Sequence, residues 1–213
     1  MKKRAKINKG FFLIFDFDGT IADTKQLYYL GIYNELKKYG FNHNQVNKII
    51  NLGLSLEETL KKFGFSFIVL WILKMKIMKN VKKNIRDVKK CRDVEEIKKI
   101  KERKIIVSNS LKEFVVPIIT HFKLNKYFEG IYGAEDFNDK AEFIKEYLKK
   151  NRIKKDRCYY IGDRAADIRV ARKVGCKGII IMSKCAWNSR KEILDENPEI
   201  IVSDIAEIKD VLK

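Results

Sequence analysis

The chain has 213 residues but little proline and no long apolar run, and each shortage excludes a class of protein. The 2 prolines favour helices joined by short loops over a proline-rich or solenoid-like architecture. The apolar run 11–15 is too short for a secretory signal, and the run 65–73 falls short of the ~20 residues that span a bilayer. A soluble, cytoplasmic protein with no membrane partner is therefore expected.

Cysteine and histidine are scarce as well. The 4 cysteines form no C-x-x-C pair, so reduced thiols in a cytosolic protein are expected. His43 and His121 have no partners at the spacing of metal ligands, and both are interpreted as structural.

Acidic residues are few beside basic ones, with 28 Asp and Glu against 46 Lys and Arg and a net charge of +18. Such a surface attracts anionic substrates and adheres to nucleic acid without specificity. No zinc knuckle, aromatic RNA-binding signature or basic tail accompanies the charge, so no specific nucleic-acid partner is expected. A nucleic-acid-binding protein, or an enzyme that acts on polynucleotide ends, stays open as an interpretation of this charge.

Short apolar runs alternate with helical patterns along most of the chain. The continuous run Phe11–Phe15 is typical of a strand buried on both faces of a parallel sheet. Further strands are expected at 104–108, 129–132, 158–161, 178–182 and 200–202, and helices at 111–122, 140–151, 165–174 and 204–212. This alternation predicts an α/β fold with a Rossmann-like, doubly wound parallel sheet.

The interval from residue 22 to about residue 90 breaks that rhythm. It has no convincing strand and is predicted to form four helices, at 25–39, 44–51, 56–63 and 67–89. Ser55 with Glu58 fits a capping box, as does Asp93 with Glu96, which would open a helix leading back to the sheet. The predicted organisation is a core domain of residues 1–22 and 90–213, with an α-helical cap domain, residues 23–89, inserted after the first strand.

The segment 65–78 is the most apolar part of this expected cap. We interpret it as a cap helix whose apolar face lines a pocket. A dimer contact is the alternative, so both a monomer and a homodimer stay open.

Acidic residues follow directly on the first expected strand, in the run Asp16-Phe17-Asp18-Gly19-Thr20. Residues i and i+2 of an extended chain point the same way, so both carboxylates can face one site beyond the carboxyl end of the strand. Ligands of open α/β sheets bind there. Gly19 permits a tight turn, and its N–H can approach a bound anion closely.

Three further polar elements fall where later strands end or later helices begin. Ser108 and Asn109 offer a hydroxyl and N–H groups to a phosphate at the start of a helix. Lys140 begins another helix, where its ammonium can meet the same phosphate. The run 162–167 supplies Asp163 and Asp167, whose hard oxygen atoms are the ligands that Mg²⁺ prefers.

These four elements occur in the order found in one family. With DFDGT at 16–20, Ser108-Asn109, Lys140 and the GDxxxD pattern at 162–167, the chain resembles a haloacid dehalogenase-superfamily phosphatase with a helical cap after the first strand. The tail, with Trp187-Asn188-Ser189-Arg190, resembles the phosphoglycolate phosphatase-like branch. The resemblance implies a Mg²⁺-dependent phosphatase that hydrolyses a small organic phosphate monoester, with phosphoglycolate as the first candidate among small phosphorylated metabolites.

The resemblance also implies a role for each matching residue. Asp16 would be the nucleophile that forms an aspartyl phosphate, and Asp18 would protonate the leaving oxygen and then deprotonate water. Mg²⁺ would be held by the Asp16 carboxylate, the Asp18 backbone carbonyl and Asp163, with Asp167 orienting a metal-bound water. The phosphate would be bound by Gly19, Ser108, Asn109 and the catalytic Lys140, whose segment lacks the prolines common in related phosphatases.

Two further interpretations concern the type of reaction and the role of Arg164. An aspartate at position 18 argues for phosphoryl transfer over dehalogenation, because a leaving halide needs no proton. A phosphomutase of the same fold, passing the phosphoryl group to a sugar hydroxyl, stays open. For Arg164, a surface ion pair is preferred over contact with substrate.

Overall fold

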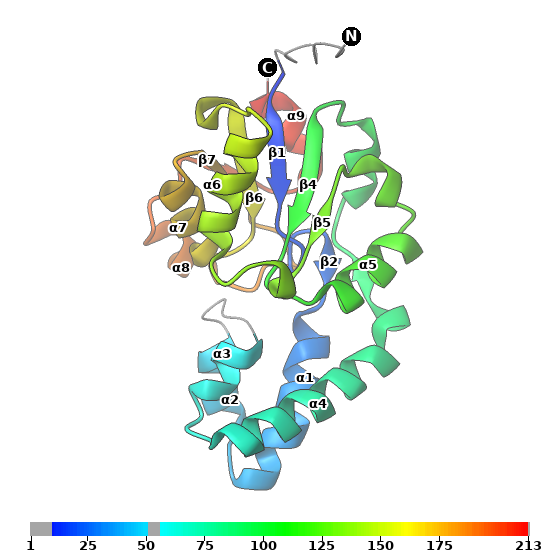
Figure 1. The fold of residues 1–213 in the computed structure, drawn as a ribbon, viewed down its shortest axis with the longest axis vertical. Coiled ribbons are helices and arrows are strands. Elements are labelled where there is room, and N and C mark those ends of the chain that lie inside the picture. The colour runs from blue at the N-terminus through cyan, green and yellow to red at the C-terminus, as the bar shows by residue number, and fades with distance from the viewer. Residues whose placement is uncertain (1–9, 51–55, 213) are drawn as a thin grey trace.

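The computed structural model describes residues 10–50 and 56–212. Within them, one parallel sheet is built from the strands β1 (Phe12–Phe15), β4 (Arg103–Val107), β5 (Ile131–Tyr132), β6 (Cys158–Gly162), β7 (Lys177–Ile181) and β8 (Ile200–Val202). Their order across the sheet is β5-β4-β1-β6-β7-β8, so β1 is central (Figure 1). The order reverses on either side of β1, as in a doubly wound fold, and the predicted fold class is confirmed.

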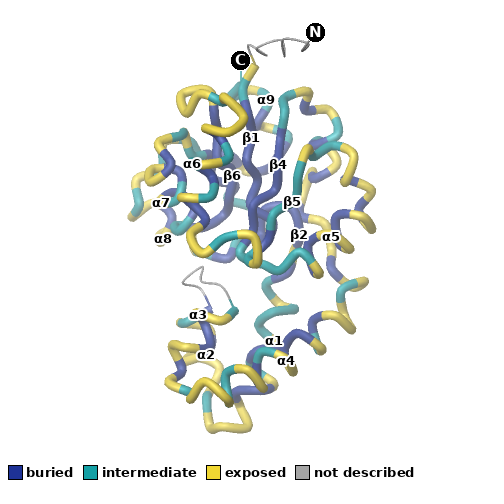
Figure 2. Tube along the Cα trace, viewed as in Figure 1, coloured by how far each residue is buried: buried dark blue, intermediate teal, exposed yellow. Residues whose placement is uncertain are grey.

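The first strand shows why its sequence is continuously apolar. All four residues of β1 are buried. Leu13 and Phe15 pack into a cluster on one face of the sheet, while Phe12 and Ile14 pack into a cluster on the other. Because both faces are covered, no position along the strand is left for a polar side chain. Figure 2 shows the same burial along the central strands.

Helices cover both faces of the sheet. On one face lie α6 (Lys140–Lys150) and α7 (Ala165–Val174), which contribute Ile144, Leu148 and Val174 to the cluster with Phe12. On the other face lie α5 (Lys112–His121), α9 (Ile208–Val211) and a 3₁₀ turn at Val94–Lys99. A short helix, α8 (Arg190–Leu194), was not predicted from the sequence.

Four α-helices of the described residues lie between β1 and β4 in the sequence, and we call them the cap helices. They are α1 (Lys25–Leu36), α2 (His43–Ile50), α3 (Leu56–Lys61) and α4 (Phe67–Lys83). They share an apolar core of their own, which includes Leu36, Val46, Leu60, Leu73 and Ile77. Figure 1 shows them beneath the carboxyl ends of the strands, while the division of the chain at residues 23 and 89 stays a prediction.

The prediction that residues 22 to 90 contain no strand was wrong. Helix α4 ends at Lys83, six residues before its predicted end at Lys89. The strands β2 (Ala22–Asp23) and β3 (Lys89–Lys90) pair antiparallel where the chain enters and leaves the cap helices. Two residues are too few to show an apolar alternation, so the hydrophobic pattern gives no sign of such a pair.

The capping box predicted for Asp93 and Glu96 was also wrong. Asp93 adopts the left-handed conformation, with φ of 56°, and its side chain makes no capping bond to the 3₁₀ turn that follows. A capping side chain normally sits on an extended residue, from which it reaches the first helical N–H groups. The other box involves Ser55, which lies outside the described residues.

The structure also bears on the predictions for the apolar cap segment, the cysteines and membrane spans. Helix α4 buries Leu73, Ile77 and Met78, and it contributes Lys74 and Met78 to the lining of the main cavity. Its opposite face leaves Phe67 and Trp71 exposed. All 4 cysteines are free thiols, as predicted. No helix in the described part of the chain is both long enough and apolar enough to cross a bilayer.

Candidate active site

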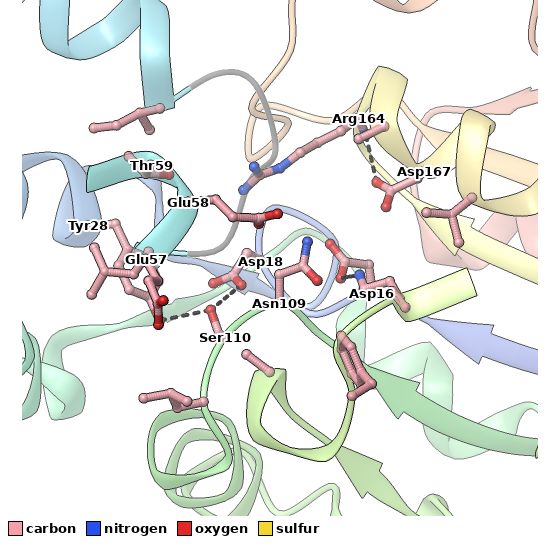
Figure 3. A pocket seen from close by; sticks show the side chains of 18 of the residues that line it. Asp16, Asp18, Tyr28, Glu57, Glu58, Thr59, Asn109, Ser110, Arg164 and Asp167 are labelled. Atoms are coloured by element: carbon pink, nitrogen blue, oxygen red, sulfur yellow. Dashed lines mark hydrogen bonds and ion pairs between the residues drawn. The ribbon is translucent and has the colours of Figure 1, made fainter. Parts of the chain in front are cut away.

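A cavity of about 770 Å³ lies between the carboxyl edge of the sheet and the cap helices. The core contributes Asp16, Asp18 and Lys140 to its lining, and the cap helices contribute Tyr28 and Glu57 among others. Figure 3 shows this cavity from close by. Its volume falls within the range of roughly 300–1,000 Å³ that is typical of small-molecule sites.

Asp16 and Asp18 lie just beyond β1, and both are buried. The N–H of Asp16 donates to the carbonyl of Ile161 at 2.7 Å, which continues the pairing of β1 with β6 and fixes this backbone. The Asp16 carboxylate accepts from Lys140 Nζ at 2.9 Å. The Asp18 carboxylate instead accepts from the hydroxyl of Thr24 at 2.6 Å. The two carboxylates therefore share a site but have different partners, an ammonium and hydroxyl groups.

The expected tight turn is present at Gly19, which has φ of +75°. A Cβ atom there would lie 2.3 Å from Asp163 Oδ2 and 2.6 Å from Trp187 Cδ1, so only glycine fits. The Gly19 N–H donates to the carbonyl of Ala22 at 2.8 Å. This differs from the prediction that it approaches an anion, because the turn itself already uses the donor.

Lys140 lies at the first position of α6 and is buried against Asp16 and Tyr160. Its ammonium donates to Asp16 Oδ1 at 2.9 Å and to the Tyr160 hydroxyl at 2.8 Å. Asp139 caps the helix by accepting from the N–H groups of the two residues after Lys140. The cap holds the backbone of Lys140, so its side chain extends to the end of the neighbouring strand without any proline in the segment.

Asp163 and Asp167 follow β6 and are both buried, Asp163 completely. Asp163 accepts from the hydroxyl of Thr20 at 3.1 Å and from the N–H of Trp187 at 2.7 Å. Asp167 Oδ2 accepts from the N–H groups of Asp163 and Arg164, at 3.0 and 2.9 Å, at the start of α7. Asp167 therefore caps its own helix while its carboxylate remains beside the other acidic groups.

Within the described residues, Asp16, Asp163 and Asp167 each offer a carboxylate oxygen to one place, with these oxygens within 4.8 Å of one another. Burial raises the pKa of Asp163 well above its usual value. Burial, followed by the charge of Asp16, raises the pKa of Asp167 to about 6. Carboxylates gathered away from water repel one another, and a divalent cation would offset that repulsion. Their hard oxygen atoms fit Mg²⁺.

Replacing Asp163→Asn is expected to raise the melting temperature of the metal-free protein and to abolish further stabilisation by Mg²⁺. Burial favours the protonated carboxyl, so the folded chain binds protons more tightly than the unfolded chain. The free energy of unfolding therefore falls as the pH rises. The fall begins near the pKa of an aspartate in the unfolded chain, about 3.9, and continues through the raised pKa of Asp167, about 6. The asparagine removes one of these ionisable groups. If this stabilises the protein by about 1 kcal/mol, the melting temperature rises by roughly 2–4 °C at this chain length.

Melting curves at pH 5 and pH 7, with and without Mg²⁺, measure this effect. Asp156, exposed in a 3₁₀ turn, is the matched control, because Asp156→Asn removes a carboxylate far from the cluster. Equal Mg²⁺ stabilisation of the native chain and Asp163→Asn would show that Asp163 holds no cation.

The segment after β4 faces Asp18. Ser108 is fully buried and donates to Asp18 Oδ2 at 3.3 Å. Ser110 donates to the same oxygen at 2.6 Å and accepts from the Tyr28 hydroxyl at 2.9 Å. Asn109 lines the cavity and lies between Asp18 and Asp16 in the view of Figure 3. The sequence indicated Ser108 and Asn109 but not Tyr28, whose place in a helix of the cap carries no motif.

The prediction of a surface ion pair for Arg164 was wrong. Its side chain is only 8% exposed, and its guanidinium carbon lies 3.7 Å from the centre of the Trp187 ring. Arg164 precedes α7 in an extended conformation, which directs its side chain into the cavity, as Figure 3 shows. Trp187 was noted in the sequence only as part of a resemblance, and the structure brings it to the site through its bond to Asp163.

Comparisons with known proteins show the family of this chain. A family model described as haloacid dehalogenase-like hydrolase matches residues 13–181. A protein of Caldanaerobacter subterraneus subsp. tengcongensis, assigned as the pyrophosphatase PpaX, is 26% identical over 94% of this chain and 94% of its own length. The phosphoglycolate phosphatase of Aquifex aeolicus is 27% identical over 78% of this chain and 81% of its own length.

A solved structure is similar as well. The crystal structure of a Clostridium difficile protein assigned as a phosphatase has a TM-score of 0.75 at 26% identity, covering 97% of this chain and 100% of that one. The chain belongs to the haloacid dehalogenase-like hydrolase family. Within that superfamily it is an enzyme of the phosphatase kind, a hydrolase of phosphate esters.

Proposed function

We propose that this enzyme is a Mg²⁺-dependent phosphatase that hydrolyses a small organic phosphate monoester through an aspartyl phosphate on Asp16. Phosphoglycolate is the first candidate substrate, since one relative of similar length is named a phosphoglycolate phosphatase. The observation that carries the proposal is the contrast between two neighbouring carboxylates. Asp16 contacts the ammonium of Lys140, whereas Asp18 lies among hydroxyl groups.

In the first step, a carboxylate oxygen of Asp16 attacks phosphorus while the bond from phosphorus to the leaving oxygen breaks. Asp18 gives its proton to that leaving oxygen. Burial, and then the charge of Asp16, raises the pKa of Asp18, which favours the protonated acid needed at this point. The product alcohol leaves, and the phosphoryl group stays on Asp16.

In the second step, Asp18 takes a proton from a water molecule that attacks phosphorus and displaces the Asp16 carboxylate. Inorganic phosphate leaves, and both aspartates return to their starting states. Lys140, Ser108 and Asn109 hold the phosphoryl oxygens in this proposal, the ammonium as a point charge and the others as hydrogen-bond donors. The cap helices shield the reaction from bulk water.

The carboxylates of Asp16 and Asp163 would hold Mg²⁺ together with the backbone carbonyl of Asp18, and Asp167 would orient a water bound to the ion. When bound, Mg²⁺ supplies the positive charge that offsets these carboxylates and the phosphoryl oxygens. The three clustered carboxylate oxygens and the raised pKa of Asp163 support this assignment.

Phosphate release from an aryl phosphate and from a panel of phosphometabolites tests the proposal. Chelation by EDTA is expected to reduce release to the background rate, and added Mg²⁺ is expected to restore it. Full activity after chelation would contradict the metal dependence. An excess of a sugar acceptor separates the phosphomutase alternative, because a mutase would then form a phosphosugar in place of free phosphate.

A further inference from the structure

Two buried hydrogen-bond donors in the described part of the chain have no acceptor. They are Nε of Arg164 and Nε1 of Trp187. The two side chains stack on each other, with the guanidinium carbon 3.7 Å from the ring centre. Buried donors without partners are rare in folded proteins. Two of them in one contact indicate a place where a ligand supplies the acceptor.

Both side chains line the main cavity together with Asp18 and Tyr28. Figure 3 shows Arg164 reaching from the start of α7 toward the cap helices, whereas Asp16 lies lower in the cavity near the core. Trp187 packs in the apolar cluster that the cap helices share, so both side chains belong to the part of the cavity that faces the cap. In the proposed reaction, that part receives the leaving group, because the phosphoryl group is held at Asp16.

A second cation lies beside this pair. Lys25, in the first turn of α1, donates to the backbone carbonyl of Trp187 at 2.7 Å. Burial, followed by the repulsion of Arg164, lowers the pKa of Lys25, and the charges of Asp163 and Glu192 offset these two causes only in part. An anion bound at Arg164 would relieve the repulsion that remains.

No ion pair joins Arg164 to a carboxylate among the described residues. Its charge acts on Asp18 and Asp163 from a distance and lowers their pKa values, although burial raises both by more. Glu58 of α3 also lines the cavity and has an interaction of its own. A ligand whose positive group contacts Glu58 is thus the competing possibility, and a substrate with an ammonium group tests it.

We propose that Arg164 and Trp187 form a subsite for an oxyanion on the leaving group, a carboxylate or a second phosphate. This inference rests on the proposed phosphatase function. A guanidinium presents its N–H groups as a planar fork that matches such an anion, and stacking on the indole ring fixes the plane of that fork. The indole N–H is a further donor without a partner.

Phosphate esters of three two-carbon alcohols test the subsite. Phosphoglycolate carries a carboxylate, 2-hydroxyethyl phosphate carries a neutral hydroxyl, and phosphoethanolamine carries an ammonium. The native enzyme is expected to have the highest kcat/KM for phosphoglycolate. In Arg164→Gln, the ratio of kcat/KM for phosphoglycolate to that for 2-hydroxyethyl phosphate is expected to fall about 10- to 100-fold, as for the loss of a charged hydrogen bond.

Two milder variants and a control sharpen the result. Arg164→Lys keeps the charge but loses the fork, so its ratio is expected to lie between those of the native chain and Arg164→Gln. Trp187→Phe keeps an aromatic ring for stacking but loses the indole N–H, and a roughly 2- to 10-fold fall in the ratio is expected. Arg86→Gln, an exposed arginine on the cap side, removes the same charge far from the subsite and is expected to keep the native ratio.

A fall of both kcat/KM values by the same factor in Arg164→Gln would overturn the subsite and leave Arg164 as a counter-ion of the buried carboxylates. A native preference for phosphoethanolamine would overturn it in favour of Glu58. Pyrophosphate as a fourth substrate distinguishes a second phosphate from a carboxylate as the preferred oxyanion. Turnover without discrimination contradicts this inference alone, whereas no turnover of any ester contradicts the proposed function.

A binding measurement tests the subsite even without turnover. In an Asp16→Asn background, calorimetry compares the affinity for phosphoglycolate with that for inorganic phosphate. Adding Arg164→Gln is expected to weaken phosphoglycolate binding at least tenfold more than phosphate binding. Equal weakening of both ligands would overturn the subsite, and a melting curve for each variant excludes misfolding as the cause.

Discussion

Replacing Asp16→Asn is expected to lower the rate of phosphate release by roughly 10⁴- to 10⁶-fold, the scale of loss when a covalent nucleophile is removed. An amide has nearly the shape of the carboxylate but cannot attack phosphorus. Asp16 is buried at the end of β1 with Lys140 on one of its oxygens. Of the four buried aspartates at the site, the others being Asp18, Asp163 and Asp167, it is the one that forms an ion pair with a lysine. Steady-state release from an aryl phosphate with saturating Mg²⁺ measures the loss.

The matched control for this substitution is again Asp156→Asn, which removes an exposed carboxylate. It is expected to keep the native rate. A rate in Asp16→Asn within about tenfold of the native rate would mean that another group, or water, attacks phosphorus, since removing a covalent nucleophile costs far more than that.

Replacing Asp18→Asn is expected to lower kcat/KM by about 10²- to 10⁴-fold for alkyl phosphates, the usual contribution of general acid catalysis. The loss for a nitrophenyl phosphate is expected to be smaller, because that leaving oxygen needs no proton. Asp18 is buried and its carboxylate is held by Thr24, Ser108 and Ser110, so its position is fixed relative to Asp16. The ratio of the losses for the two substrates is the quantity to measure.

An equal loss for both substrates would assign Asp18 to holding the site together and not to proton transfer. Hydrolysis of the aspartyl phosphate, the second step of the proposed reaction, gives an independent test of Asp18. Since Asp18 also deprotonates the attacking water in the proposal, Asp18→Asn is expected to release the nitrophenol faster in a first burst than in later turnovers.

The sequence predicts the core fold well because the core obeys simple rules. A continuous apolar run such as Phe12–Phe15 is needed wherever a strand is covered on both faces, and the structure buries all of it. Helix α4 was predicted to begin at Phe67 and does so, but it ends at Lys83. The lysine-rich residues after Lys83 are compatible with a helix, and only the pairing of β3 with β2 favours an extended chain there.

The residues of the candidate site, too, could be predicted only in part. Asp16, Lys140 and Asp163 could be expected together, because parallel strands bring their carboxyl ends to one edge of the sheet. Arg164 and Trp187 could not. Whether an arginine before a helix turns outward or into a cavity depends on which side chain is there to stack on it, and Trp187 comes from a distant part of the chain.

The central claim is that phosphate passes through a covalent bond to Asp16. The native enzyme, mixed with Mg²⁺ and an aryl phosphate and quenched within one turnover, can be treated with borohydride, which reduces an acyl phosphate to an alcohol. Peptide mapping by mass spectrometry then locates the reduced side chain. The account predicts reduction at position 16 alone, and none in Asp16→Asn. Phosphate release with no reduced residue, or with reduction at another aspartate, would contradict it.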